Sequence, residues 1–466
     1  MNSIFASGPR GRDAHGRLLA LGTWLMLAAA VTPARVAATD VTFKAETSLK
    51  ETYDSNVYIQ DNDPTPANVA AAKAAGLRPV EANKGSFVTS VLPRVGLDYK
   101  PCVAFSLSAT YAPDIVVYHS AHSEDYVAHR GLVDFGGKVG DASWELTNTV
   151  SYVDGSKEGP TFARPDDIPA IGGIPFRDRR AAFLFRNSFR LTEPVGEWFF
   201  RPVAGSYIRD FKTRQRFVPN TPPEMIRSKE YTYENYIDRQ EVSGGLDVGY
   251  RVAEGLHLVA GYRYGRQDQF EAFDASGQLV DSPYDSAYHR ILVGVEGSPA
   301  SWVKLAALFG PDLRTWNDSA RLRQMYPTFN QNKLLYYWDA SATFLPTKND
   351  TVTLKSARFE RPAFSSFSMY EDIKTDLTWR REFGGQVTAT AGFTLYIGDW
   401  QLPVNRNDWI YTPNASLTYA FTKNLSADIA YSYDWVDSRV PASVEPLTNS
   451  HEFTRHLATL GVKYAL

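Results

Sequence analysis

The sequence contains a single cysteine, Cys102, among 466 residues. One thiol cannot form a disulfide within the chain, so the fold is held by other interactions. Positive charge is not in excess either, with 49 Lys and Arg against 52 Asp and Glu and a net charge of −3. Nucleic-acid-binding domains usually carry a basic excess. These shortages exclude a disulfide scaffold and argue against a nucleic-acid partner.

Long hydrophobic runs are scarce, and the clearest one lies near the N-terminus. The apolar run Leu18–Val31 follows the basic residues Arg10, Arg12 and Arg17. It is shorter than the ~20 residues of a spanning helix. Small residues around Ala38 follow it, which is the pattern of a secretory signal. We predict that residues 1–38 are a cleaved signal peptide and that residues 39–466 form a single domain.

Beyond residue 38 the dominant pattern is alternation with a period of two, which predicts strands. In Gln386–Gly398, Arg179–Leu191 and Asn424–Trp435, apolar or aromatic residues fill one face and small, polar or charged residues fill the other. Such segments are longer than the usual globular strand of about 5–6 residues and suit a strand that crosses a bilayer at a tilt. Eighteen segments are predicted: 41–53, 86–99, 103–118, 129–139, 143–153, 180–191, 198–210, 239–252, 256–266, 286–297, 301–316, 332–345, 350–359, 371–383, 386–397, 409–421, 425–436 and 453–466.

The connections between these segments alternate in length. Tight turns follow the even-numbered segments, and longer polar stretches such as Asp54–Gly85, Asp154–Arg179 and Lys212–Asp238 follow odd-numbered ones. Short turns on one side and long loops on the other are typical of bacterial outer-membrane barrels. We predict an all-β fold: a transmembrane antiparallel β-barrel of about 18 strands (16–18), with short periplasmic turns and long extracellular loops. The alternative is a soluble β-sandwich or β-propeller.

The chain ends in an alternating segment, "TLGVKYAL", Thr459–Leu466. It resembles the C-terminal signal by which the barrel-assembly machinery recognises its clients, with Leu466 where most such signals have an aromatic residue. This resemblance implies the assembly machinery as a partner. An outer-membrane location implies contact with outer-membrane lipid and lipopolysaccharide.

Two short motifs resemble the outer-membrane β-barrel family often called beta-barrel porin 2. One is the turn Tyr53–Asn56 within Ser48–Tyr58, and the other is Gly310–Arg314. The resemblance implies an outer-membrane barrel, and some family members are associated with exopolysaccharide export.

Residues 95–115 align without gaps to residues 293–313, with seven identities at a fixed offset of 198. Asp114 and Asp312 occupy equivalent places in this internal repeat. Duplication and convergence of two similar hairpins both remain open.

Few residues suggest catalysis. His119–His129 holds three histidines with serine and acidic residues, but it matches no metal or triad spacing and is expected to be a solvated loop. Asp61–Pro64 is expected to be a turn, and Thr65–Leu77 has the N-cap, proline and glycine signals of a short helix. No catalytic residue, metal or cofactor is predicted, so we expect the protein not to be an enzyme.

The faces opposite the apolar ones carry charges of both signs. These charges would set a transverse field that filters solutes, hold neighbouring strands together, or do both. The candidate lumen-lining residues are Arg94, Asp98, Asp114, Arg186, Arg190, Asp312, Asp376 and Arg380, with Glu241, Asp247, Arg290, Glu296, Asp372 and Lys374 on the same faces.

Several functions are compatible with these features. The first is a porin-like channel for small hydrophilic solutes, and the second is an outer-membrane component of exopolysaccharide export or envelope biogenesis. An outer-membrane enzyme and an adhesin are weaker alternatives. The sequence leaves the oligomeric state open.

Overall fold

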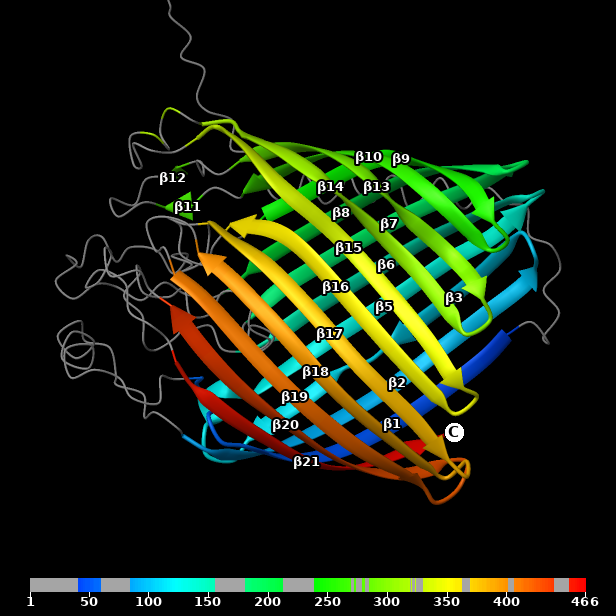
Figure 1. Ribbon diagram of the computed structural model, residues 1–466. Coiled ribbons are helices and arrows are strands. Elements are labelled where there is room, and N and C mark those ends of the chain that lie inside the picture. Colours follow the sequence, from blue (N-terminus) through cyan, green and yellow to red (C-terminus); the bar gives the residue numbers. More distant parts are fainter. Residues whose placement is uncertain are drawn as a thin grey trace, which may run out of the picture.

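The computed structural model describes the barrel wall and its short connections. The described residues are 41–59, 84–155, 181–212, 239–269, 272–273, 279–280, 285–318, 320, 323, 330–362, 369–400, 406–439 and 452–466. Within them the chain forms a closed antiparallel barrel of 18 spanning segments, which confirms the predicted fold class (Figure 1). The main sheet has 19 strands because β3 and β4 are two parts of one spanning segment, both paired with β2 and β5.

The spanning strands follow one another around the wall in chain order. Their bounds are β1 Val41–Asp54, β2 Ser86–Cys102, β3 Phe105–Tyr111, β4 Asp114–Tyr118, β5 Tyr126–Val139, β6 Ala142–Asp154, β7 Ala182–Val195, β8 Trp198–Phe211, β9 Arg239–Ala253, β10 Leu256–Gln269, β13 Ser286–Ala300, β14 Val303–Trp316, β15 Asn332–Thr347, β16 Asp350–Pro362, β17 Met369–Phe383, β18 Val387–Trp400, β19 Arg406–Ala420, β20 Leu425–Arg439 and β21 Thr454–Ala465. A separate hairpin pairs β11 (Ala272–Phe273) with β12 (Leu279–Val280). Every segment predicted from the alternation overlaps a spanning strand.

Short turns gather at one end of the barrel, as Figure 1 shows. Gly196 and Gly255 lie in two of these turns with φ of 61° and 70°. L side chains reach this left-handed region only with strain, whereas glycine enters it freely. The two glycines therefore permit a tight reversal of the chain between neighbouring strands.

The third spanning segment is interrupted where two prolines oppose each other. The pairings Val95–Tyr111 and Val91–Ile115 on either side of the gap belong to one register, which sets Pro93 against Pro113. Proline has no backbone N–H to donate to the ladder, so two opposed prolines leave a break. The sequence predicted a continuous segment over 103–118, and the structure divides it into β3 and β4.

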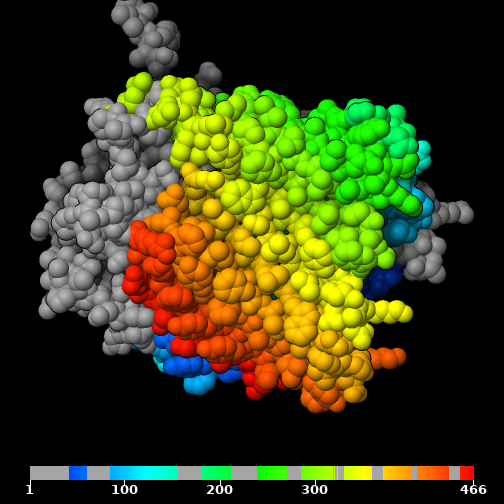
Figure 2. All heavy atoms as spheres, viewed as in Figure 1, coloured from blue at the N-terminus to red at the C-terminus, as the bar shows by residue number. Residues whose placement is uncertain are grey.

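The outer face of the wall is apolar. Along β21 the exposed large hydrophobic residues are Leu460, Val462 and Tyr464, and on β20 Ile429 is 55% exposed. Successive residues of a strand point to opposite sides, so the intervening positions face the interior. Figure 2 shows the side chains of neighbouring strands packed together along one side of this wall.

Aromatic side chains form three repeated clusters on the outer face, toward the long-loop end. In each, a tyrosine hydroxyl lies 2.7 Å from the Nδ1 atom of a histidine, and a second tyrosine ring packs against the imidazole. Amphipathic rings at this height are typical of the girdle at a membrane interface. The clusters are Tyr111–His129–Tyr152, Tyr262–His289–Tyr264 and Tyr431–His456–Tyr433.

The barrel closes where β1 pairs with β21. The Thr52 and Thr459 hydroxyls lie 2.9 Å apart across this seam, and the Arg455 guanidinium pairs with the buried Asp54 at 2.6 Å. Asn56 extends the closure, because its side chain donates to the Thr454 carbonyl oxygen at 3.3 Å. The Tyr53–Asn56 motif therefore ties the first strand to the last.

Several predicted features lie outside the described residues: the signal peptide over 1–38, the turn Asp61–Pro64 and the helix Thr65–Leu77. No helix in the described part of the chain is long and apolar enough to cross a membrane.

Candidate functional site: the charged inner wall

Long charged side chains reach across the inner face of the barrel. Arg201 of β8 donates to both carboxylate oxygens of Glu296 on β13, at 2.6 and 2.7 Å. Two strands, β9 and β10, separate these two in the wall. Side chains that far apart converge on the concave side of a curved wall and diverge on the convex side. The Arg201–Glu296 contact therefore lies on the lumenal face.

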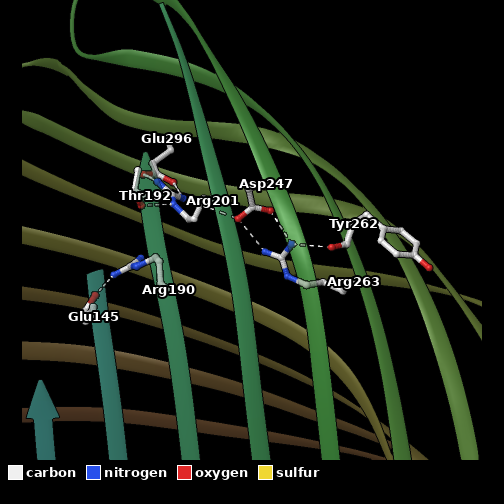
Figure 3. A network of polar contacts seen from close by, with 8 residues as sticks. All are labelled: Glu145, Arg190, Thr192, Arg201, Asp247, Tyr262, Arg263 and Glu296. Carbon is white, nitrogen blue, oxygen red and sulfur yellow. Dashed lines mark hydrogen bonds and ion pairs between the residues drawn. The ribbon is translucent and has the colours of Figure 1, made fainter. Parts of the chain in front are cut away.

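The same network continues through a shared aspartate, as Figure 3 shows. Arg201 Nε donates to Thr192 Oγ1 at 3.1 Å, and Arg201 Nη1 lies 4.0 Å from Asp247 Oδ2. Arg263 Nη2 of β10 donates to this same Asp247 oxygen at 2.9 Å. Arg201 and Asp247 are both buried. The guanidiniums of Arg201 and Arg263 thus both lie beside the buried Asp247 carboxylate, and Glu296 neutralises Arg201 from the other side.

Arg190, a predicted lumen-lining residue, lies at the edge of this network. It pairs with Glu145 of β6, directly across the ladder. Both side chains are about half exposed, at 53% and 52%. This pair therefore faces water, in contrast to the buried pair at Arg201.

A second cluster surrounds Arg290 on β13. Its Nε donates to Asp312 on β14 at 2.6 Å, and its guanidinium lies 4.0 Å from the ring centroid of Tyr288 and 4.3 Å from that of Tyr337. The Tyr288 hydroxyl donates to Glu241 at 2.8 Å. Asp312 was expected to line the lumen, yet only 3% of it is exposed. The flanking guanidinium and rings bury the carboxylate within the wall.

The remaining predicted lumen-lining residues are spread around the barrel, and most have an oppositely charged partner. Asp114 accepts from Arg130 Nε at 2.6 Å, Asp98 pairs with Lys44 and accepts from Ser108 at 2.7 Å, Asp376 pairs with Lys374 at 3.1 Å, Arg380 pairs with Glu382 at 2.8 Å, and Arg94 lies 3.8 Å from Glu46. Arg186 instead lies over the Tyr207 ring, 5.3 Å from its centroid.

Sequence reasoning missed three residues that organise the wall: Arg201, Arg263 and Arg130. The signal was present, because each alternates with outward aromatic or apolar residues. Arg201, for example, follows Phe200 in "WFFRPVAG". Alternation reveals the face of a residue. It does not reveal which of many inward charges will meet.

The three histidines of His119–His129 make separate contacts. His119 Nε2 lies 2.8 Å from Thr89 Oγ1, His122 lies 3.3 Å from Asp125, and His129 belongs to an outer aromatic cluster. Among the described residues, no group of three or more His, Cys, Asp or Glu side chains could hold a metal ion.

Cavities lie between the inner side chains. One of about 750 Å³ borders Asp98, Arg190 and Glu296. Another of about 550 Å³ borders Arg201, Asp247 and Arg290. Charged groups therefore surround spaces large enough for water and small solutes.

No family model matches the chain, and no curated protein matches it. Among solved structures, the outer membrane protein OpdK from Pseudomonas aeruginosa is 11% identical with a TM-score of 0.39, over 91% of this chain and 98% of that one. OccAB1 from Acinetobacter baumannii is 11% identical with a TM-score of 0.39, over 93% and 98%. The FrpB iron transporter from Neisseria meningitidis is 9% identical with a TM-score of 0.39, over 91% and 81%. The resemblance to the beta-barrel porin 2 family stays a prediction.

Proposed function

We propose that this protein is an outer-membrane, porin-like channel for small hydrophilic solutes. The observation that carries the proposal is the contrast between the two faces of one closed wall. Exposed aliphatic and aromatic residues cover the outside, and ion pairs cover the inside. Charge that faces hydrocarbon is costly, so this wall suits lipid outside and water inside.

The number of strands supports an aqueous path. Barrels of about 16–18 strands are wide enough to leave a channel, whereas about eight strands give an interior that side chains can fill. The cavities beside Arg201 and Arg190 agree with a wet interior. Ion pairs on opposite sides of these spaces would impose a field on any solute that passes.

Single-channel recording in planar bilayers tests the proposal. The barrel is first shown to be folded by its heat-modifiable mobility on a gel. We expect stepwise conductance in potassium chloride from folded protein and none from the same sample after boiling. A folded barrel that inserts into the bilayer without conducting would contradict the channel proposal.

A further inference from the structure

Three neighbouring strands carry polar side chains on the outer face of the wall, near the middle of its height. Asn148 of β6 lies directly opposite Asn187 of β7, which lies opposite Ser206 of β8 (Figure 1). Arg201 of β8 is lumenal, and strict alternation from Arg201 turns Ser206 outward. Directly opposed residues of neighbouring strands share a face, so both asparagines point outward as well.

The polar groups of this row satisfy only part of their hydrogen-bonding capacity. Asn187 Nδ2 donates to Asn148 Oδ1 at 2.8 Å, and Asn148 Nδ2 donates to the Val133 carbonyl oxygen at 3.5 Å. Among the described residues, no hydrogen bond reaches the Asn187 Oδ1 atom or the Ser206 hydroxyl. Because hydrocarbon offers no partner to a polar group, this row is poorly suited to contact with lipid tails.

The polar row is enclosed by apolar rows on the same face. The next outward row toward the long loops is Val150, Phe185 and Ile208, and the next row toward the short turns is Leu146, Phe189 and Ala204. On β18, at the far side of the barrel, the outward residues at this height are Ala391, Phe393 and Leu395 (Figure 1). The outer face of β6–β8 therefore differs from the opposite wall by a short polar band within an apolar surface.

We propose that the outer face of β6–β8 binds a second copy of this chain in the membrane, through a two-fold axis along the membrane normal. Both copies insert in the same direction, so this axis keeps every residue at its own depth. The polar row of one copy then meets the polar row of the other, and apolar rows meet apolar rows. An amide is both a donor and an acceptor, so Asn187 is complementary to itself across the axis.

Close packing and hydrogen bonds provide the attraction. Lipid tails are as apolar as the side chains that they contact, so association within a bilayer gains little from the hydrophobic effect. Ala204 and the opposed Gly244 of β9 are small, which lets a second wall approach closely. Five strands, β5–β9, spaced by about 4.8 Å over an apolar band about 25 Å tall, offer at most roughly 600 Å² per copy. Two copies would cover about 1,200 Å², the lower end of the range for stable interfaces.

Sedimentation equilibrium of the folded barrel in density-matched micelles tests the proposal. We expect the wild type to form dimers, and Asn148→Leu with Asn187→Leu to raise the Kd of the dimer at least about tenfold. If the two amides only joined β6 to β7, the double substitution would lower the urea midpoint and leave the dimer Kd unchanged. A wild type that stays monomeric, or a double variant that dimerises as tightly as the wild type, would overturn the proposal.

A pair of bulky substitutions locates the interface without removing either asparagine. Ala204 on β8 and Ala391 on β18 are both exposed on the outer face. Lipid accommodates a tryptophan at either position, but a second wall packed against β8 does not. Ala204→Trp should therefore raise the dimer Kd at least about tenfold, and Ala391→Trp should leave it unchanged. Equal effects of the two substitutions would exclude this face as the interface.

Crosslinking in the membranes of the expressing cell distinguishes a second copy from another protein. We expect an adduct of twice the mass of the barrel, which the Asn148→Leu and Asn187→Leu double variant loses. An adduct of a different mass that depends on the same two asparagines would overturn the second copy as the occupant. The proposal concerns the outer face alone and stands whether or not the barrel conducts.

Discussion

At the scale of single residues, the inner wall holds two kinds of ion pair. The Arg201 side chain is 10% exposed and makes a bidentate ion pair with Glu296, whereas the paired Arg190 and Glu145 face water. Breaking a buried pair leaves a desolvated charge behind, but exposed pairs contribute little. The two arginines lie in the same network region and so make a matched comparison.

We expect Arg201→Ala to lower the free energy of unfolding by roughly 2–3 kcal/mol, somewhat below the range for a fully buried pair because Glu296 keeps partial access to water. Arg190→Ala should lower it by less than about 1 kcal/mol. Urea titration of the folded barrel, followed by gel mobility, measures both changes. Equal losses of unfolding free energy in the two variants would contradict the difference between the buried and the exposed ion pair.

A pH effect is expected at the turn between β7 and β8. A hydrogen bond from Arg251 holds the pKa of the Glu197 carboxyl below its usual range. A carboxyl with a lowered pKa in the folded state stabilises that state above its ordinary pKa of about 4.3, and the contribution is lost as the pH falls through the lower folded value. The urea midpoint of the wild type should therefore fall more than that of Glu197→Gln on acidification from pH 6 to pH 3. Parallel pH profiles for the two proteins would show that the Glu197 carboxylate does not stabilise the folded barrel.

Contacts between residues were harder to predict than the faces on which they lie. The alternation placed Asp312 on the inner side, but its burial depends on Arg290 and Tyr288 of the preceding strand. Likewise, Asp114 and Asp312 are equivalent in the internal repeat, yet Asp114 pairs with the following strand and Asp312 with the preceding one. Local pattern determines the direction of a side chain, and the curvature and register of several strands determine its partner.

At the scale of strands, the sequence predicted the number and order of spanning segments because each carries its own period-two pattern. The break at Pro113 was not predicted, since its cause lies in the register that sets Pro93 opposite. The equivalent Pro311 lies inside an uninterrupted β14. The β13–β14 pairing skips Pro311, but the β14–β15 pairing runs through it opposite Tyr336, so β14 stays continuous. Where two prolines oppose each other, the strand is divided.

A pair of substitutions on β20 tests which face meets lipid. Ile429 is exposed on the outer face, and Ser432 lies on the inner face. Ile429→Arg should destabilise the folded barrel by roughly 2–4 kcal/mol near the midplane and reduce folding yield in liposomes. Ser432→Arg should fold nearly as well as the wild type, because its charge reaches the lumen. A reversed order of yields would require the opposite orientation of this strand.

At the scale of the whole molecule, closure joins residues some 400 positions apart in the chain. Arg455 meets Asp54 of β1 and lies 3.9 Å from Asp434 of β20, so one guanidinium links three strands at the seam. Closure leaves no unpaired strand edge among the spanning strands, which hydrocarbon would penalise. The strongest test of the architecture is therefore a covalent link across this seam.

Thr52 and Thr459 are directly opposed, with their hydroxyls 2.9 Å apart. Opposed residues of antiparallel strands have Cα atoms about 4.5–5.5 Å apart, which is within reach of a disulfide. In a Cys102→Ser background, Thr52→Cys with Thr459→Cys should oxidise to one intramolecular bond in the folded barrel, seen as a shift in gel mobility that reductant reverses. Thr52→Cys with Gly461→Cys, displaced by two residues along β21, is the control and should form little bond. Similar yields for both pairs would mean that the first and last strands do not close in the register described here.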